Sequence, residues 1–225
     1  VADGEAARGL ATAVLESVVE YEPTPDERTL IAFPLCHVSG YSVPVTHLRG
    51  GRIVLTPMLN PQGKLIGDFT IAKAKDGSFY MWGSSQAQKY HMRWFEQHLP
   101  SDGSVHIHRY DMGLVGLSIA GPKSRAVLDK LTDTDVSNAA FKFMDHRAMD
   151  IGNVPALINR VTYTGDLGYE IWVAPDYQRR LYQEIMKAGK DEGIINFGMR
   201  ALLCMRLEKN FPTWYRELRP IYGGF

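Results

Sequence analysis

The clearest structural pattern in the sequence lies between Met58 and Trp82 and reads MLNPQGKLIGDFTIAKAKDGSFYMW. The apolar run from Leu65 to Ala72 predicts a buried strand, and a second strand is expected from Ser78 to Trp82. Asp76-Gly77 between them is a strong turn signal, so the two strands are expected to form an antiparallel hairpin. Asp68 interrupts the first strand, where a carboxylate needs a donor, a cation or solvent because burying it alone is costly.

Outward from this hairpin, pairs of strands alternate with single helices. Downstream we expect a helix at 84–98, strands near 105–110 and 114–119, a helix at 122–131, strands near 143–151, 156–163 and 169–173, and helices at 176–192 and 197–207. Upstream we expect a helix at 6–21 and strands at 28–33 and 52–56. Such an order predicts an α+β fold.

The composition is that of an ordinary globular protein and excludes several classes of function. Among 225 residues, Lys+Arg and Asp+Glu both number 25, and no basic stretch suggests nucleic acid as a partner. No apolar run is long enough to span a bilayer, so no membrane partner is expected. The two cysteines, Cys36 and Cys204, lie far apart, and acidic residues near the N-terminus do not fit a signal or transit peptide. We therefore expect a cytoplasmic protein.

Four stretches carry a resemblance to a known family. They are Met58 to Thr70, Leu117-Ser-Ile-Ala-Gly-Pro-Lys-Ser-Arg125, Tyr163-Thr-Gly-Asp-Leu-Gly-Tyr-Glu170-Ile, and Leu203-Cys-Met-Arg-Leu-Glu-Lys209. In this order and spacing they resemble the aminomethyltransferase fold family, which includes the glycine-cleavage aminomethyltransferase and the C-terminal folate domains of dimethylglycine and sarcosine dehydrogenases. The sequences Gly67-Asp-Phe-Thr and Arg216-Glu-Leu-Arg-Pro-Ile-Tyr resemble the dimethylglycine dehydrogenases more than the glycine-cleavage aminomethyltransferases.

The resemblance implies an aminomethyltransferase-type folate-binding domain over residues 58–225. Its activity would be tetrahydrofolate-dependent one-carbon transfer from a methylated amine of the dimethylglycine, sarcosine or glycine type. A flavin-containing oxidoreductase is the implied partner, since this sequence has no GxGxxG fingerprint of its own. The family's N-terminal segment and C-terminal barrel are expected to be missing.

The resemblance also implies roles for individual residues. Asp68 is the expected catalytic residue, where an anion would stabilise developing positive charge and steer proton transfer. Tyr163 and Glu170 are expected in the pterin pocket, with the carboxylate binding the amino-pyrimidine edge and the ring adding flat apolar area. Arg206 and Ser84 complete the expected cofactor-binding set.

Each assignment has a structural alternative. Asp68 could serve only to end a strand, Tyr163 and Glu170 could decorate an exposed hairpin, and Arg206 could form a surface ion pair with Glu208. Two positions depart from the glycine-cleavage pattern, which has an Asn where this sequence has Ser84 and an Arg where it has Leu202.

Residues 1–57 are similar instead to an interior fragment of the acyl-CoA synthetases, on the motif Pro34-Leu-Cys-His37-Val-Ser-Gly40. The phosphate-binding loop and the later lysine motif of those enzymes are absent, so ATP could not be held by backbone N–H groups. His37 is therefore expected to be structural, within a small α/β fragment that precedes the folate-binding domain. A catalytically inactive folate-binding module, a fusion remnant and an acyl-CoA ligase fragment are the alternatives for the chain as a whole.

Two further patterns attract attention. His106 and His108 share one face of an expected strand, but they have no acidic or Cys partner nearby, and no metal site is expected. Tyr90, His91, Trp94 and Phe95 form an aromatic stripe on the expected helix, and such a stripe is typical of core packing.

Overall fold

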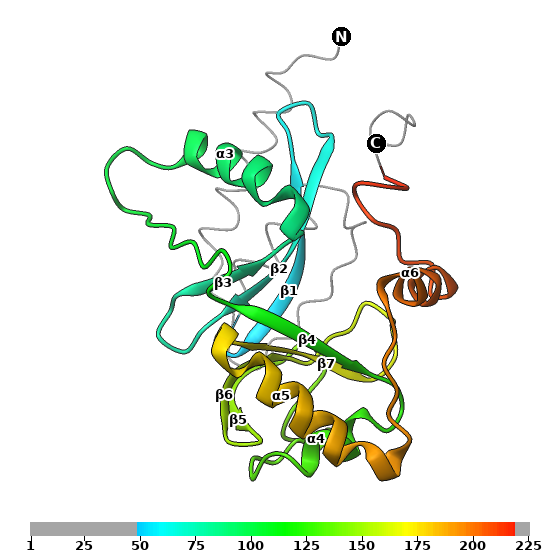
Figure 1. The fold of residues 1–225 in the computed structure, drawn as a ribbon. Coiled ribbons are helices and arrows are strands. Elements are labelled where there is room, and N and C mark those ends of the chain that lie inside the picture. Colours follow the sequence, from blue (N-terminus) through cyan, green and yellow to red (C-terminus); the bar gives the residue numbers. More distant parts are fainter. Residues whose placement is uncertain (1–48, 219–225) are drawn as a thin grey trace.

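The structure, a computed structural model, describes residues 49–218 (Figure 1). Two antiparallel sheets form its centre. The first has strand order β1-β2-β3, with β1 at Arg52–Leu59, β2 at Leu65–Lys73 and β3 at Phe79–Trp82. The second has order β4-β7-β6-β5, with β4 at Val115–Ala120, β5 at His146–Ile151, β6 at Val154–Asn159 and β7 at Gly168–Val173.

One helix, α3 (Gln88–His98), covers the outer face of the first sheet and follows the short 3-10 helix η1 (Ser85–Ala87). Phe69 of β2 packs against Phe95 of α3, with ring centroids 5.5 Å apart. The buried imidazole of His91 reaches the backbone of β2, where its Nε2 lies 3.0 Å from the carbonyl oxygen of Ile66. Gly67 makes this possible, because a Cβ at that position would lie 2.6 Å from the same nitrogen.

The main apolar core lies on the outer face of the second sheet. Tyr169, Ile171 and Val173 of β7 are buried there against α5 (Pro175–Ala188), which contributes Leu181 and Ile185. Helix α4 (Ser124–Asp129) adds two more buried residues, Val127 and Leu128. Burial of each such side chain is worth roughly 1.5–3 kcal/mol, so this face holds the domain together.

The remaining faces of the two sheets are turned toward each other, so that the order of layers is helix, sheet, sheet, helices (Figure 1). The sheets are joined at one edge, where β1 meets the start of β5. An isolated bridge pairs Arg52 with Asp145, and the guanidinium and carboxylate of these residues also form an ion pair. The amide of His146 donates to the carbonyl oxygen of Gly51 at 2.8 Å.

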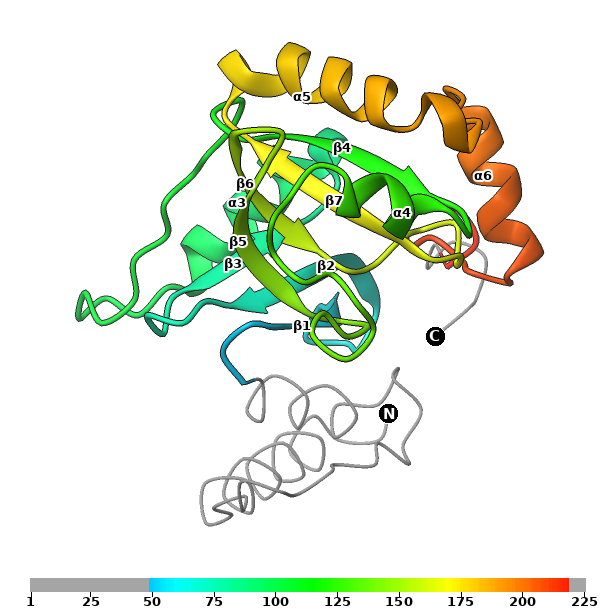
Figure 2. The same ribbon diagram turned by 90° about the horizontal axis from the view of Figure 1, so that it is seen from below.

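The last elements lie beside the two sheets rather than on them. A short 3-10 helix, η2 (Lys190–Glu192), follows α5, and α6 (Met199–Glu208) comes next. Figure 2 shows the chain turning back after α6 toward the loop between β6 and β7. The hydroxyl of Tyr163 in that loop donates to the carbonyl oxygen of Pro212 at 3.4 Å, and Lys209 pairs with Asp166 at 3.3 Å.

Most of the expected elements are confirmed, including the α+β class and the hairpin of β2 and β3. The strand expected near 105–110 is wrong. Residues 104–110 have no regular secondary structure, and both Val105 and Ile107 are exposed, because no strand within residues 49–218 pairs with this segment.

The elements expected at 6–21 and 28–33, together with Cys36 and His37, lie outside the described residues. The division of the chain between residues 57 and 58 stays a prediction. Strand β1 runs through that position and pairs with β2 on both sides of it. No helix within 49–218 has the length and apolar character needed to cross a membrane.

Candidate functional site

The facing sides of the two sheets carry polar and aromatic side chains. Residues Asp68 and Thr70 alternate along β2 on this side, and Thr70 pairs with Trp82 of β3. On the second sheet, Glu170 pairs with Asn159 of β6, and Asn159 pairs with His146 of β5. We call this set the inter-sheet site, with these members: Asp68, Thr70, Tyr80, Trp82, His146, Asn159, Glu170 and Trp172.

Aromatic contacts connect the two halves of the inter-sheet site. The ring of Trp82 lies 5.9 Å from that of Trp172 and 5.6 Å from that of His146. Tyr80 lies 5.6 Å from both Trp82 and His146. The two strands of the first hairpin thus bring flat apolar surface next to the polar strands β6 and β7.

Glu170 is the acidic member contributed by the second sheet. It is largely covered by protein, and this burial raises the pKa of Glu170 to about 7. Hydrogen bonds from the side chains of Asn159 and Trp172 lower the pKa and so offset part of this rise. A carboxylate with a pKa near neutrality inside a polar and aromatic setting is a recurring property of functional sites.

His146 holds the amide of Asn159 in one orientation. The Nδ1 atom of His146 lies 2.8 Å from Oδ1 of Asn159, and both residues are buried. Burial lowers the pKa of His146, so the ring is neutral and its Nδ1–H donates to that oxygen. The Nδ2 group of Asn159 is then directed to the other side, toward Glu170, because the reverse orientation would place an amide oxygen against a carboxylate.

Two buried N–H groups lie beside Glu170, namely Nδ2 of Asn159 and Nε1 of Trp172. Hydrogen bonding by these two side chains lowers the pKa of Glu170 and thus favours its charged form. Trp172 is held flat over Gly116 of β4, where a Cβ would come within 2.8 Å of the indole ring.

Asp68 is the acidic member contributed by the first sheet. Its side chain keeps contact with solvent, but the protein around it removes enough water to raise the pKa of Asp68 above its usual range. Leu55, which points to the same side of the first sheet through its pairing with Thr70, is also exposed, at 52%. The inter-sheet site is therefore open to solvent at this end.

Tyr163 interacts electrostatically with Asp68. Burial raises the pKa of Tyr163 to about 12; the charge of Arg206 opposes this rise, and Asp68 and Glu217 add to it. Three residues expected at the site from the sequence, Asp68, Tyr163 and Arg206, thus share one electrostatic neighbourhood.

Arg206 is almost completely buried and is engaged within the protein. Its two terminal nitrogens donate to the carboxylate of Glu217 at 2.8 and 2.7 Å, and one of them also donates to the carbonyl oxygen of Phe211. The alternative of a surface ion pair with Glu208 is wrong, since Arg206 is buried and its ionic partner is Glu217. This pair folds the segment after α6 back onto the helix, and the contact of Tyr163 with Pro212 joins that segment to the loop between β6 and β7.

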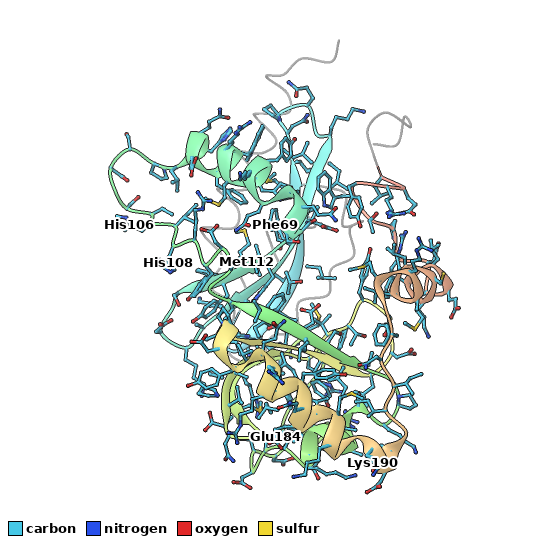
Figure 3. All side chains as sticks on the ribbon, in the orientation of Figure 1. Phe69, His106, His108, Met112, Glu184 and Lys190 are labelled. Atoms are coloured by element: carbon cyan, nitrogen blue, oxygen red, sulfur yellow. The ribbon has the colours of Figure 1, made fainter. Side chains whose placement is uncertain are left out.

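The other expected residues lie further from these groups. Ser84 comes just after β3 at the start of η1 and makes no capping hydrogen bond through its side chain. His106 and His108 lie on the exposed loop after α3 (Figure 3). No group of three His, Cys, Asp or Glu residues suited to a metal ion occurs in the described part of the chain. In the aromatic stripe, His91 and Phe95 pack inward as expected, whereas the expectation of core packing is wrong for Tyr90, which is 50% exposed.

Reasoning from the sequence missed Asn159, His146 and Trp172. Two signals were available in hindsight. Trp172 is two positions after Glu170 and so shares its face of the strand, and Asn159 is a polar residue at the end of an apolar strand. The contact of both with the first hairpin needs the stacking of two sheets, which no linear pattern shows.

Comparison with known proteins gives a consistent set of relatives. Residues 40–222 match the GCVT N-terminal domain. The chain is 36% identical over 165 residues to human mitochondrial dimethylglycine dehydrogenase, covering 73% of this chain and 19% of that protein. It is 29% identical to an aminomethyltransferase of Thermoanaerobacter sp. (strain X514), covering 80% of this chain and 50% of that protein.

A solved structure shares the fold. The crystal structure of glycine cleavage system aminomethyltransferase T from Bartonella henselae superposes with a TM-score of 0.61 at 19% identity, over 77% of this chain and 43% of that one. The family match begins at residue 40, within the segment 1–57 that carries the different resemblance.

Proposed function

The chain belongs to the family of the GCVT N-terminal domain, and we propose that it binds tetrahydrofolate at the inter-sheet site for transfer of a one-carbon unit from a methylated amine. When bound, tetrahydrofolate supplies the nitrogens that accept the carbon. The contribution of the protein is to hold the ring, to place charge beside it and to exclude water.

The observation that carries this proposal is the setting of Glu170. The ring of a reduced folate has flat apolar faces and an edge with two neighbouring N–H donors. Glu170 offers a carboxylate that can accept two parallel donors, and Trp82 and Trp172 supply aromatic surface beside it.

We propose that Asp68 takes part in the one-carbon transfer reaction and not in binding the folate ring. It faces the same inter-sheet space from the first sheet and stays accessible to solvent. Its raised pKa makes proton exchange near neutral pH easier than for an ordinary aspartate. As an anion it would stabilise positive charge that develops on the amine during transfer. Tyr163, nearby, is proposed to line the same space.

The amine and the partner are proposed from the relatives. The similarity to dimethylglycine dehydrogenase supports a methylated glycine derivative as the source of carbon, and a flavin-containing oxidoreductase as the partner that oxidises it. The chain spans 19% of that dehydrogenase and 50% of the aminomethyltransferase, so both assignments are proposals about a larger system. Location in the cytoplasm stays a prediction from the sequence.

A second candidate is a folate-binding module that has no transfer activity. It is favoured by the engagement of Arg206 with Glu217, which leaves that cation occupied within the protein. The two candidates share the inter-sheet site and differ only in whether Asp68 acts on a substrate.

Calorimetric titration with tetrahydrofolate tests the binding of folate at the inter-sheet site, which both candidate functions require. The parent chain should bind, and Glu170→Ala should bind roughly tenfold to a hundredfold more weakly, because losing hydrogen bonds to a charged group costs ~1.5–3 kcal/mol. Glu96→Ala, which removes an exposed carboxylate from α3, is the matched control and should bind like the parent. Equal affinity of Glu170→Ala and the parent, with both folded, would remove the assignment.

A further inference from the structure

Three arginine side chains gather around the loop of residues 138–141, away from the inter-sheet site. The loop accepts hydrogen bonds from Arg125 of α4, Arg147 of β5 and Arg160, which follows β6. Its last residue, Phe141, belongs to the main core on the outer face of the second sheet. We call the three arginines, together with Asn138, the arginine cluster. The arginine cluster therefore lies on the opposite side of this sheet from the inter-sheet site.

Arg125 and Arg160 share a single neutral acceptor. A terminal nitrogen of each donates to Oδ1 of Asn138 at 2.6 Å, so these two nitrogens are no further apart than twice that distance. Neither guanidinium forms an ion pair with a carboxylate of the residues that the structure describes. Like charges this close repel each other, and one amide oxygen does not cancel the repulsion.

The arginine cluster also has donors without acceptors. The Nε–H groups of Arg125 and Arg160 are buried and have no hydrogen-bond partner among residues 49–218. Tyr169, whose ring stacks on Phe141 with centroids 5.8 Å apart, is completely buried, and its hydroxyl is unpaired as well. Buried donors are rarely left without an acceptor. Positive charge and hydrogen-bond donors are thus both in excess at this place.

The acidic residues closest to the loop in sequence are engaged elsewhere. Asp145 pairs with Arg52 of β1, and its other oxygen lies 4.0 Å from Arg147. Asp135 accepts a hydrogen bond from the backbone amide of Ser137 within its own turn. Arg147 therefore has a carboxylate neighbour, whereas the other two arginines of the cluster have none.

We propose that Arg125 and Arg160 form a binding site for a phosphate group, with Asn138 at its entrance. The planar forks of two guanidinium groups match the oxygens of a phosphate, whose charge of about −2 near neutral pH balances both arginines. Asn138 is exposed, so a phosphate reaches the site from solvent, and its amide can rotate to donate to the same phosphate. This site is independent of the proposed function, because it uses none of the residues assigned to folate.

Calorimetric titration of the whole chain with inorganic phosphate in a chloride buffer tests the site directly. One equivalent should bind, and the midpoint of thermal unfolding should rise by roughly 5–10 °C at a phosphate concentration about a hundredfold above Kd. Arg125→Gln keeps an amide donor but removes one charge, and it should lose most of both responses. Arg179→Gln, which removes an exposed arginine from α5, is the matched control and should respond like the parent.

Asn138→Asp tests the excess of charge without any ligand. The substitution places a carboxylate where both arginines now share a neutral oxygen, and so imitates a bound anion. In chloride buffer this variant should unfold at a higher temperature than the parent, and phosphate should raise its midpoint no further. A variant that is less stable than the parent would overturn the proposal.

A phosphate monoester, glycerol phosphate, identifies the source of the phosphate group. Binding of both compounds supports a phosphorylated small molecule as the ligand, and binding of inorganic phosphate alone supports the free ion. Absence of saturable binding of either compound would overturn the proposal. Equal responses of the parent, Arg125→Gln and Arg179→Gln would overturn it as well, because they would show a general effect of phosphate on the folded state.

Discussion

Glu170 combines a stability cost with a proposed role in binding. Burial raises its pKa to about 7, which means that folding disfavours its charged form. If Glu170 served only to pack against its neighbours, a neutral side chain at this position would make the fold more stable. Retaining a costly carboxylate is typical of sites where function opposes stability.

Glu170→Gln should therefore change stability in a pH-dependent way. The folded-state pKa lies above that of the unfolded chain, so the folded protein binds more protons between about pH 4.5 and 7. Its stability thus falls as the pH rises through this window and is constant above it. Denaturant unfolding should show a variant close to the parent at pH 4.5, and more stable by on the order of 2 kcal/mol at pH 8. A variant that is less stable than the parent at pH 8 would contradict this account.

Asp68→Asn should separate chemistry from binding. The substitution keeps size and polarity but removes the charge and the exchangeable carboxyl proton. Affinity for tetrahydrofolate should stay nearly unchanged, whereas one-carbon transfer should fall by on the order of a hundredfold or more. Transfer is followed with the complete amine-oxidising system, and binding by calorimetry on the chain alone. A loss of affinity with no separate loss of transfer would show that Asp68 is a binding residue.

At the scale of elements, the segment after α6 is held to the end of that helix by one buried cation. Arg206 binds the carboxylate of Glu217 through two nitrogens, and the backbone amide and hydroxyl of Thr213 donate to the same carboxylate. Arg206 and these donors hold the pKa of Glu217 well below its usual range. Tyr163 and Asp68 lie next to this pair, so its geometry supports one end of the inter-sheet site.

Glu217→Gln should loosen this segment. The carboxylate is 39% exposed, so after screening by solvent we expect a loss of about 1–2 kcal/mol at pH 7. Because the folded-state pKa is lowered, this stabilisation is complete above the unfolded-state pKa of about 4.3 and disappears as the pH falls below it. Thermal unfolding at several pH values measures it. Glu208→Gln, which changes an exposed acid at the end of α6, is the control; an equal effect of both variants would rule out the assigned role of Glu217.

How much the sequence predicts differs from one element to the next. The hairpin of β2 and β3 was predictable because a strong turn signal separates two apolar runs, and α5 was predictable from its apolar spacing. The strand predicted near residues 105–110 was wrong because Val105 and Ile107 alternate with histidines, a pattern that is typical of a strand. A strand forms only where a partner exists, and the partner is a property of the fold.

The same reasoning applies to the site. Motif resemblance pointed to Asp68, Tyr163 and Glu170, and the structure places all three around the facing sides of the sheets or the adjoining loop. Their roles stay predictions. Asn159 and Trp172 became visible only through strand order and through their position beside Glu170, both of which are three-dimensional properties.

In the whole molecule, stability and the proposed function occupy different faces of the same sheets. The apolar cores lie on the outer faces, under α3 on one side and under α4 and α5 on the other. The facing sides carry two carboxylates, buried N–H groups and stacked aromatic rings. A ligand bound between the sheets would therefore contact residues that the cores do not require.

Hydrogen exchange with and without saturating tetrahydrofolate tests most directly whether the ligand binds between the sheets. At short exchange times, which report local motion, the ligand should slow exchange in β3, β6 and β7, whose side chains surround Glu170. Helices α3 and α5, on the outer faces, should change little at those times. Protection confined to the outer helices, or no protection in β6 and β7 under conditions where calorimetry shows binding, would contradict a folate site between the sheets.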